Sequence, residues 1–274
     1  MFDTVIEMLS YPFMTRAFLV GSLVALCSAL LGVSLVLKRY SMIGDGLSHV
    51  GFGAMAIAAA MNAAPLTVAI PVVIVAAILL LRISGNAKIK GDAAIALIST
   101  TSLAVGVMVI SLTTGMNTDV YNYMFGSILA MSAENVKLSL VLSVFVLILF
   151  IAFYHKIFAI TFDETFARAT GVKAGVYNML IAVLTAVTIV LGMRMMGALL
   201  ISSLIIFPAL TSMRVCRTFK SVIINAAVIS VVCLIAGVTL SYVAATPAGA
   251  SVVLANLVMM VLYTVVGAVK NHMR

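Results

Sequence analysis

The run Leu-Ser-Leu-Val-Leu-Ser-Val-Phe-Val-Leu-Ile-Leu-Phe-Ile-Ala-Phe-Tyr, residues 138–154, contains no charged side chain. As a helix, the segment 137–158 is about twenty residues long, which is enough to cross a bilayer core about 30 Å thick. Similar runs recur along the 274 residues, which are 64% hydrophobic and 9% charged. A soluble domain is about 25% charged, and a transmembrane barrel would alternate polar and apolar residues. The sequence therefore predicts an all-α polytopic membrane protein.

Polar residues divide the chain into nine predicted spans, with no separate soluble domain or linker. Residues 1–274 are therefore predicted to form a single transmembrane domain. Eight spans, with one segment interfacial or re-entrant, is the alternative, because only a few residues separate the two spans around Arg194. The nine spans are expected near residues 13–37, 42–61, 65–82, 93–115, 137–158, 176–193, 196–214, 220–243 and 250–268.

The distribution of Lys and Arg predicts the orientation. With the N-terminus outside and the C-terminus inside, thirteen of the 16 basic residues fall on the interior side, and reversing the chain inverts this bias. Lys and Arg collect in cytoplasmic loops, so we expect N-out and C-in. The net charge of +8 is therefore interpreted as a sign of topology, and no nucleic-acid partner is predicted.

Two further segments interrupt the apolar pattern. Residues 116–126 are too polar and aromatic to cross the membrane, and Tyr and Phe favour the interface, so we expect a short helix within 116–136 at the outer mouth. Pro208 lies inside an apolar run, where a proline kinks a helix and frees a backbone carbonyl. Such a kink serves either packing or the lining of a watery cavity.

Asp45 and His49 stand out because they lie within an otherwise apolar predicted span. Four residues apart, they share one helix face, and a carboxylate with an imidazole makes half of a divalent-metal site. No other predicted span carries an acidic residue, and no basic residue in another helix core neutralises Asp45. The alternatives are a simple Asp–His hydrogen bond or Asp45 capping a helix that begins at Leu47.

The depth and ligand number of this pair can be estimated. If the helix begins at Arg39, His49 lies about 15 Å along it, near the membrane midplane. A tetrahedral Zn²⁺ site needs four ligands, and two copies of the chain would supply them across a two-fold axis. Alternatively, each chain completes its own site with Ser48, Thr211 or backbone carbonyls. Ser48, Pro208 and Thr211 are candidate residues lining the metal path.

Residues 155–178 form the longest predicted cytoplasmic connection. Thr161 or Asp163 is expected to cap a short helix over 163–170, and Gly171 to end it. One face of this helix would carry Phe162, Phe166 and Ala169. An exposed amphipathic helix suits a groove on another protein, although an ordinary interfacial helix would have the same pattern.

Four ordered motifs in the chain resemble those of the permease subunits of bacterial zinc/manganese ABC importers, the ABC-3 family. The resemblance covers nearly the whole chain, with Gly46 and Leu210 where alanine is usual. The motifs are Gly-Asp-Gly-Leu-Ser-His at 44–49, Phe-Gly-Ser-Ile-Leu-Ala-Met-Ser at 125–132, Phe-Asp-Glu-Thr-Phe-Ala-Arg-Ala-Thr-Gly-Val at 162–172, and 197–211 ending in Pro-Ala-Leu-Thr.

The resemblance implies a function in transport across a bacterial plasma membrane. It implies that Asp45 and His49 lie on the metal path and that the 163–170 helix docks on an ATPase. The docking residues would be Asp163, Glu164, Phe166, Arg168 and Gly171.

The chain has no Gly-x-x-x-x-Gly-Lys-Ser/Thr run, so it is expected to be no enzyme, and ATP hydrolysis would belong to a separate ATPase dimer. The other expected partners are a second copy of the chain, an extracytoplasmic metal-binding protein and membrane lipid.

Zinc is the expected cargo, because histidine with carboxylate suits it, and no permanently bound cofactor is expected. Manganese and ferrous iron are the alternatives for the metal. An importer of another solute, such as a metal chelate, and an ATPase-independent ion-coupled carrier are the alternatives for the function. The carrier would often place intramembrane charges in both halves of the chain, whereas only the first half has one.

Overall fold

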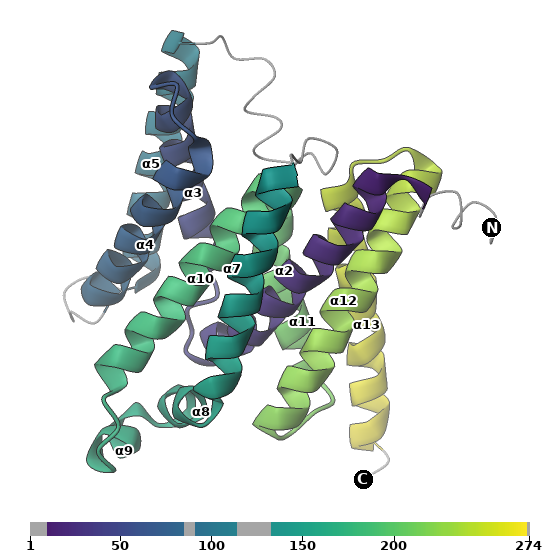
Figure 1. The fold of residues 1–274 in the computed structure, drawn as a ribbon. Coiled ribbons are helices and arrows are strands. Elements are labelled where there is room, and N and C mark those ends of the chain that lie inside the picture. The colour runs from purple at the N-terminus through teal and green to yellow at the C-terminus, as the bar shows by residue number, and fades with distance from the viewer. Residues whose placement is uncertain (1–9, 85–90, 114–132, 273–274) are drawn as a thin grey trace.

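The computed structural model describes residues 10–84, 91–113 and 133–272, and throughout these ranges the regular secondary structure is helical (Figure 1). The helices pack side by side, so that each buries an apolar stripe against its neighbours. In chain order they are α2 (Pro12–Leu37), α3 (Ile43–Ala60), α4 (Pro65–Ser84), α5 (Gly91–Thr113), α7 (Ala133–Ala152), α8 (Tyr154–Phe162), α9 (Glu164–Ala169), α10 (Ala174–Met196), α11 (Ala198–Met213), α12 (Phe219–Ala244) and α13 (Ala248–His272).

The described helices confirm the predicted fold class. Eight of the nine predicted spans each coincide with one helix, and seven of the described helices are long and apolar enough to cross a membrane. The span predicted at 137–158 is broken at Phe153, where α7 and α8 meet at an angle of 68°, and the pair together makes an eighth candidate. The 16-residue α11 is the short helix of the set. The structure is therefore compatible with both eight and nine spans.

Gly197 makes the connection between α10 and α11 by itself. Its φ of 87° and ψ of 159° lie in a region that is essentially restricted to glycine. The very short connection that made this pair of spans ambiguous is therefore a single-residue reversal. α11 continues through Pro208 to Met213, so the proline does not end the helix.

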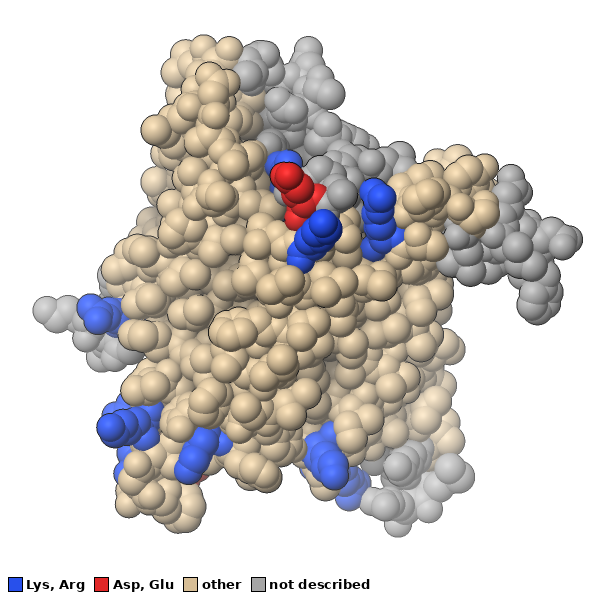
Figure 2. Space-filling view, in the orientation of Figure 1, with Lys and Arg blue, Asp and Glu red and all other residues tan. Residues whose placement is uncertain are grey.

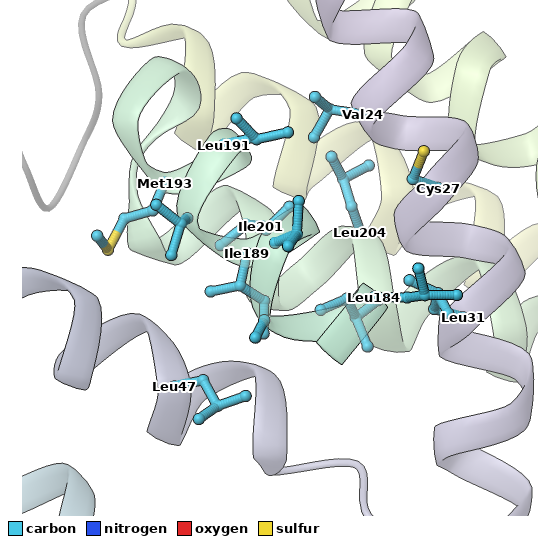
Figure 3. Packing of buried hydrophobic residues seen from close by; sticks show 14 of the residues in the cluster. Val24, Cys27, Leu31, Leu47, Leu184, Ile189, Leu191, Met193, Ile201 and Leu204 are labelled. Carbon is cyan, nitrogen blue, oxygen red and sulfur yellow. The ribbon is translucent and has the colours of Figure 1, made fainter. Parts of the chain in front are cut away.

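The helices form two groups in Figure 1. α3, α4 and α5 pack together on one side, while α2, α11, α12 and α13 pack together on the other. α10 contacts both groups, through α3 and α4 on one side and α2 and α11 on the other. Figure 3 shows the buried centre of this arrangement, where side chains of α2, α10 and α11 meet: Val24, Cys27, Leu31, Leu184, Ile189, Leu191, Ile201 and Leu204.

On the face shown in Figure 2, the charged side chains lie mainly above the centre and along the lower part, and the broad central area between them carries none. This is the distribution expected of a body that spans a hydrocarbon layer. The orientation N-out and C-in stays a prediction. The interfacial helix predicted within 116–136 falls largely on residues 114–132, as does the 125–132 motif, and these lie outside the described residues.

Candidate metal site

The turn between α2 and α3 sets where the Asp45 segment begins. α2 ends in a Schellman motif: the Tyr40 N–H donates to the Leu35 carbonyl at 2.8 Å and the Arg39 N–H to the Val36 carbonyl at 3.0 Å. Arg39 takes the left-handed conformation this motif needs, with φ 62°. A helix cannot continue through that residue, so α3 begins only at Ile43.

The depth estimate for His49 therefore rests on a wrong premise. The estimate assumed continuous helix from Arg39, but residues 38–42 form a turn and α3 starts at Ile43. About 9 Å of helix, instead of about 15 Å, separates the start of the helix from His49. Asp45 is the third residue of α3 and lies in its first turn.

Asp45 and His49 share one face of α3, as their spacing predicted, and we call them the α3 pair. The carboxylate Oδ2 lies 3.7 Å from the imidazole Nε2. This distance is too long for a hydrogen bond, so the Asp–His hydrogen bond is absent from this structure. The capping alternative is also wrong, because Met42 occupies the N-cap of α3 and no side chain caps this helix.

The α3 pair is partly open. The Asp45 side chain is 44% exposed and the His49 side chain 18% exposed. Within the described ranges, neither side chain has a further ion-pair or hydrogen-bond partner. A carboxylate with several free lone-pair sites beside an imidazole can bind a cation without first breaking a strong interaction.

Two glycines next to Asp45 bring neighbouring helices close to α3. A Cβ at Gly44 would lie 3.0 Å from Ile205 Cδ1 of α11, and one at Gly46 would lie 2.6 Å from Ile95 Cγ2 of α5. At about 100° per residue, Asp45 projects between these two directions. The α3 pair therefore faces the space between α5 and α11. The absence of a side chain at Gly46 leaves room for the Cγ2 methyl group of Ile95.

The candidate lining residues lie at different places. Ser48 is buried on α3, and its hydroxyl donates to the Asp45 carbonyl oxygen at 2.7 Å. Pro208 and Thr211 are buried on α11, about one and two turns beyond Ile205. The Thr211 hydroxyl has no hydrogen-bond partner among the described residues. The structure therefore places Ser48 beside the α3 pair, and Pro208 and Thr211 on the helix that packs against Gly44.

One chain offers few side-chain ligands in this region. Throughout residues 10–84, 91–113 and 133–272, no group of three or more His, Cys, Asp and Glu side chains could hold a metal ion. The α3 pair could supply two ligands, whereas a tetrahedral site takes four. A complete site would need further ligands from other groups of this chain, from water, or from a second copy.

The short helix predicted at 163–170 is present as α9, Glu164–Ala169. Asp163 caps it, accepting a hydrogen bond from the Phe166 N–H at 2.8 Å, and Gly171 ends it with φ 85°. Thr161 is not the cap, because its hydroxyl donates to the Ile157 carbonyl within α8. Phe162, Phe166 and Ala169 are exposed, as expected of a docking face.

Glu164 of α9 is the centre of a polar cluster that the sequence did not indicate. Its Oε2 accepts from Lys38 Nζ at 3.3 Å and from Asn178 Nδ2 at 3.0 Å, while Oε1 accepts from Arg168 Nη2 at 2.6 Å. Lys38 also donates to the Asn178 Oδ1. We call these four residues the Glu164 cluster. Its members come from α9, from the end of α2 and from α10.

Electrostatics in the Glu164 cluster favour the ionised carboxylate. Burial alone would raise the pKa of Glu164. The hydrogen bonds from Asn178 and Arg168, with the charge and hydrogen bond of Lys38, outweigh burial and hold this pKa below its ordinary value. For Lys38, burial exceeds the attraction of Glu164 and lowers the pKa of the ammonium. The cluster borders a cavity of about 610 Å³ that Tyr40 and Arg82 also line.

Comparison with known proteins places this chain among transport proteins. The model of the ABC 3 transport family matches residues 10–267. The chain is 30% identical to the high-affinity zinc uptake system membrane protein ZnuB of Haemophilus influenzae, covering 90% of this chain and 94% of that protein. It is 27% identical to the manganese transport system membrane protein MntC of Halalkalibacterium halodurans, covering 90% and 85%.

A third relative is a probable iron transport system membrane protein of Haemophilus influenzae, 32% identical, with 88% of this chain and 86% of that protein covered. Among solved structures, the chain is similar to PsaBC from Streptococcus pneumoniae in complex with a Fab. The TM-score is 0.85 at 26% identity, and 95% of this chain and 94% of that chain are covered. The fold likeness therefore extends over nearly the whole molecule.

Proposed function

This chain belongs to the ABC 3 transport family, and from that premise we propose that it is the permease subunit of an ATP-driven importer of divalent metal, with Zn²⁺ as the cargo. The observation that carries this proposal is the α3 pair. A carboxylate without a hydrogen-bond partner among the described residues and an imidazole lie 3.7 Å apart on a helix that is otherwise mostly buried and apolar. An ionisable pair of this kind in a membrane protein marks a pathway or a site.

The chemistry of the α3 pair favours a transported transition-metal ion. A cation between Asp45 and His49 would offset the carboxylate charge that the structure leaves without a strong partner. Mixed nitrogen and oxygen ligands suit Zn²⁺, whereas Mn²⁺ prefers oxygen. The relatives named for zinc, manganese and iron support the class of cargo, and zinc in particular rests on the histidine.

A transport site must also release its ion, so a closed four-ligand cage within one rigid chain would be unsuitable. We propose that two copies of the chain form a homodimer and each contributes an Asp45–His49 pair near the two-fold axis. Opening this interface would separate the ligands and free the ion. A site within each subunit, completed by Ser48 or by Thr211, is the alternative arrangement.

The proposed cycle needs partners on both sides of the membrane. A binding protein would deliver the ion on the outer side, consistent with the N-out, C-in orientation. On the inner side, α9 with its exposed Phe166 would dock in a groove of an ATPase, which supplies the hydrolysis that this chain lacks a motif for. The assembly would lie in the plasma membrane of a bacterium.

Uptake in reconstituted transporter complexes tests the site. We expect Asp45→Ala and His49→Ala each to reduce metal uptake to background, while co-purification with the ATPase is retained. Glu134→Gln and His155→Gln are matched controls, because both side chains are exposed and lie outside the α3 pair. Full uptake in both alanine variants would refute the site assignment.

The identity of the ion is tested separately, by measuring which metals the wild-type complex accumulates from an equimolar mixture of Zn²⁺, Mn²⁺ and Fe²⁺. We expect zinc to enter in excess. Preferential accumulation of manganese or iron would overturn zinc as the cargo and leave the metal-importer proposal standing.

A further inference from the structure

The Glu164 cluster is the polar connection between α9 and the rest of the described chain. Of the residues of α9, Ala167 is buried, while Glu164 reaches inward to Lys38 and Asn178. Lys38 is only 11% exposed and Glu164 33% exposed, so this ion pair is partly removed from water. Separating the two would leave a buried ammonium without its carboxylate, which is more costly than breaking a surface pair.

Lys38 belongs to a turn held firmly by backbone hydrogen bonds. It is the C-cap residue of α2, and the Schellman motif formed by Arg39 and Tyr40 follows it directly. The Tyr40 carbonyl then accepts from the Ile43 N–H at 3.0 Å, which ties the turn to the first residue of α3. These hydrogen bonds fix the backbone between Lys38 and the start of α3 and leave it few free dihedral angles.

Packing places the start of α3 on the same cluster. Tyr40 and Ile43 line a small cavity together with Lys38 and Asn178. Burial, and to a lesser extent the charge of Glu164, raise the pKa of the Tyr40 hydroxyl. The tyrosine therefore lies within electrostatic reach of the Glu164 carboxylate. Asp45 follows Ile43 by two residues, within the first turn of α3.

We propose that Lys38 is a positioning residue that joins α9, through Glu164, to the metal-binding pair Asp45 and His49. The inference rests on the proposed function, which makes α9 the ATPase contact and Asp45 with His49 the metal site. The connection between them consists of contacts within this chain. When an ATPase displaces α9, Glu164 carries the end of α2 with it. The α2–α3 turn then moves the first turn of α3, which changes the geometry at Asp45. Coupling carried by such a packed network is worth a few-fold to tens-fold in an equilibrium.

The first experiment measures metal transported per ATP hydrolysed in the reconstituted complex. We expect Lys38→Met to lower this ratio about fivefold while ATP hydrolysis continues, because the ATPase then turns over without moving α3. Lys38→Arg should restore most of the ratio, since it keeps a cation at Glu164. Lys173→Met is the matched control, since Lys173 is exposed and forms no ion pair within the described ranges. An unchanged ratio in Lys38→Met would overturn the proposal.

The second experiment does not depend on metal or ATP. Spin labels at Met42, before α3, and at Thr165, on α9, report the distance between the turn and α9 in the permease alone, in nanodiscs. We expect one narrow distance distribution in the otherwise unaltered chain and in Lys173→Met, and a broad one in Glu164→Gln. A distribution that stays equally narrow in Glu164→Gln would refute the connection. If wild-type complexes carry no metal but the distribution broadens, the proposed function fails and the connection stands.

Discussion

The α3 pair and the Glu164 cluster each contain a carboxylate, and the two carboxylates differ in how many hydrogen bonds they accept. Glu164 receives hydrogen bonds from three side chains that belong to three segments. Asp45 has one imidazole at 3.7 Å and is 44% exposed. A carboxylate whose oxygens accept hydrogen bonds from several segments holds those segments together. A carboxylate without such partners is free to bind a ligand. On this physical ground, Glu164 is suited to a structural contact between segments and Asp45 is suited to binding a ligand.

The largest expected effect comes from substituting both side chains of the α3 pair. In the double variant Asp45→Asn with His49→Gln, uptake should fall to background and should be no lower than in either single variant. When two residues act as one unit, substituting either one already abolishes the function. The losses from the two substitutions therefore do not add. Uptake measured over a range of metal concentrations checks this. Losses that multiply would show that Asp45 and His49 act at separate sites.

The next effect concerns the packing that holds the α3 pair in place. Gly46→Ala would put a Cβ 2.6 Å from Ile95 Cγ2, so the Ile95 side chain or one of the two helices must shift. Overpacking of this kind costs about 1–3 kcal/mol, so the melting temperature of the purified permease should fall. Adding Ile95→Ala should relieve the clash and recover part of the loss. An unchanged melting temperature in Gly46→Ala would show that the packing between α3 and α5 adjusts to the added methyl group at little cost.

A smaller effect is expected at the cap of α9. Asp163→Ala removes the acceptor for the Phe166 N–H and should destabilise this short helix by about 1 kcal/mol. If α9 must be formed in order to dock, the affinity for the ATPase should fall about fivefold, as measured by binding to the immobilised permease. Asp163→Asn, which retains a capping oxygen, is the matched control. An affinity that is equal in all three proteins would separate docking from the folding of α9.

The smallest effect is on the pH dependence of stability. The pKa of Glu164 is lowered in the folded chain. The stabilisation from its ionised form is therefore complete above the ordinary carboxyl pKa and is lost as the pH falls through the lowered value. Partial exposure limits it to roughly 1 kcal/mol or less. The melting temperatures of wild type and Glu164→Gln should differ at neutral pH and converge in acid. A difference that grows on acidification would contradict the assigned direction.

The features that sequence alone predicted are those with a local signal. Uninterrupted apolar runs marked the helices, the four-residue spacing put Asp45 and His49 on one face, and Asp163 with Gly171 marked the ends of α9. The span predicted at 42–61 matches α3, but the depth estimate for His49 assumed helix from Arg39. Arg39 adopts a left-handed conformation that glycine takes most often, so nothing in the sequence indicated the turn at this residue.

The Glu164 cluster could not be predicted from local sequence patterns. Lys38 is 126 residues from Glu164 and 140 from Asn178, and no pattern in a single sequence connects residues so far apart. The sequence indicated Glu164 as a docking residue, but nothing in it indicated a contact with Lys38 or Asn178. Only the packing of α2, α9 and α10 brings them together, and with them the path from α9 to the α3 pair.

X-ray absorption at the zinc edge of the purified permease, loaded with one equivalent of Zn²⁺, tests the central claim most directly. The account predicts a first shell of nitrogen and oxygen ligands at about 2.0–2.1 Å with the outer-shell signature of imidazole. That signature should disappear in His49→Gln and persist in His155→Gln. A spectrum that keeps its imidazole signature in His49→Gln would contradict the assignment of the ion to the α3 pair.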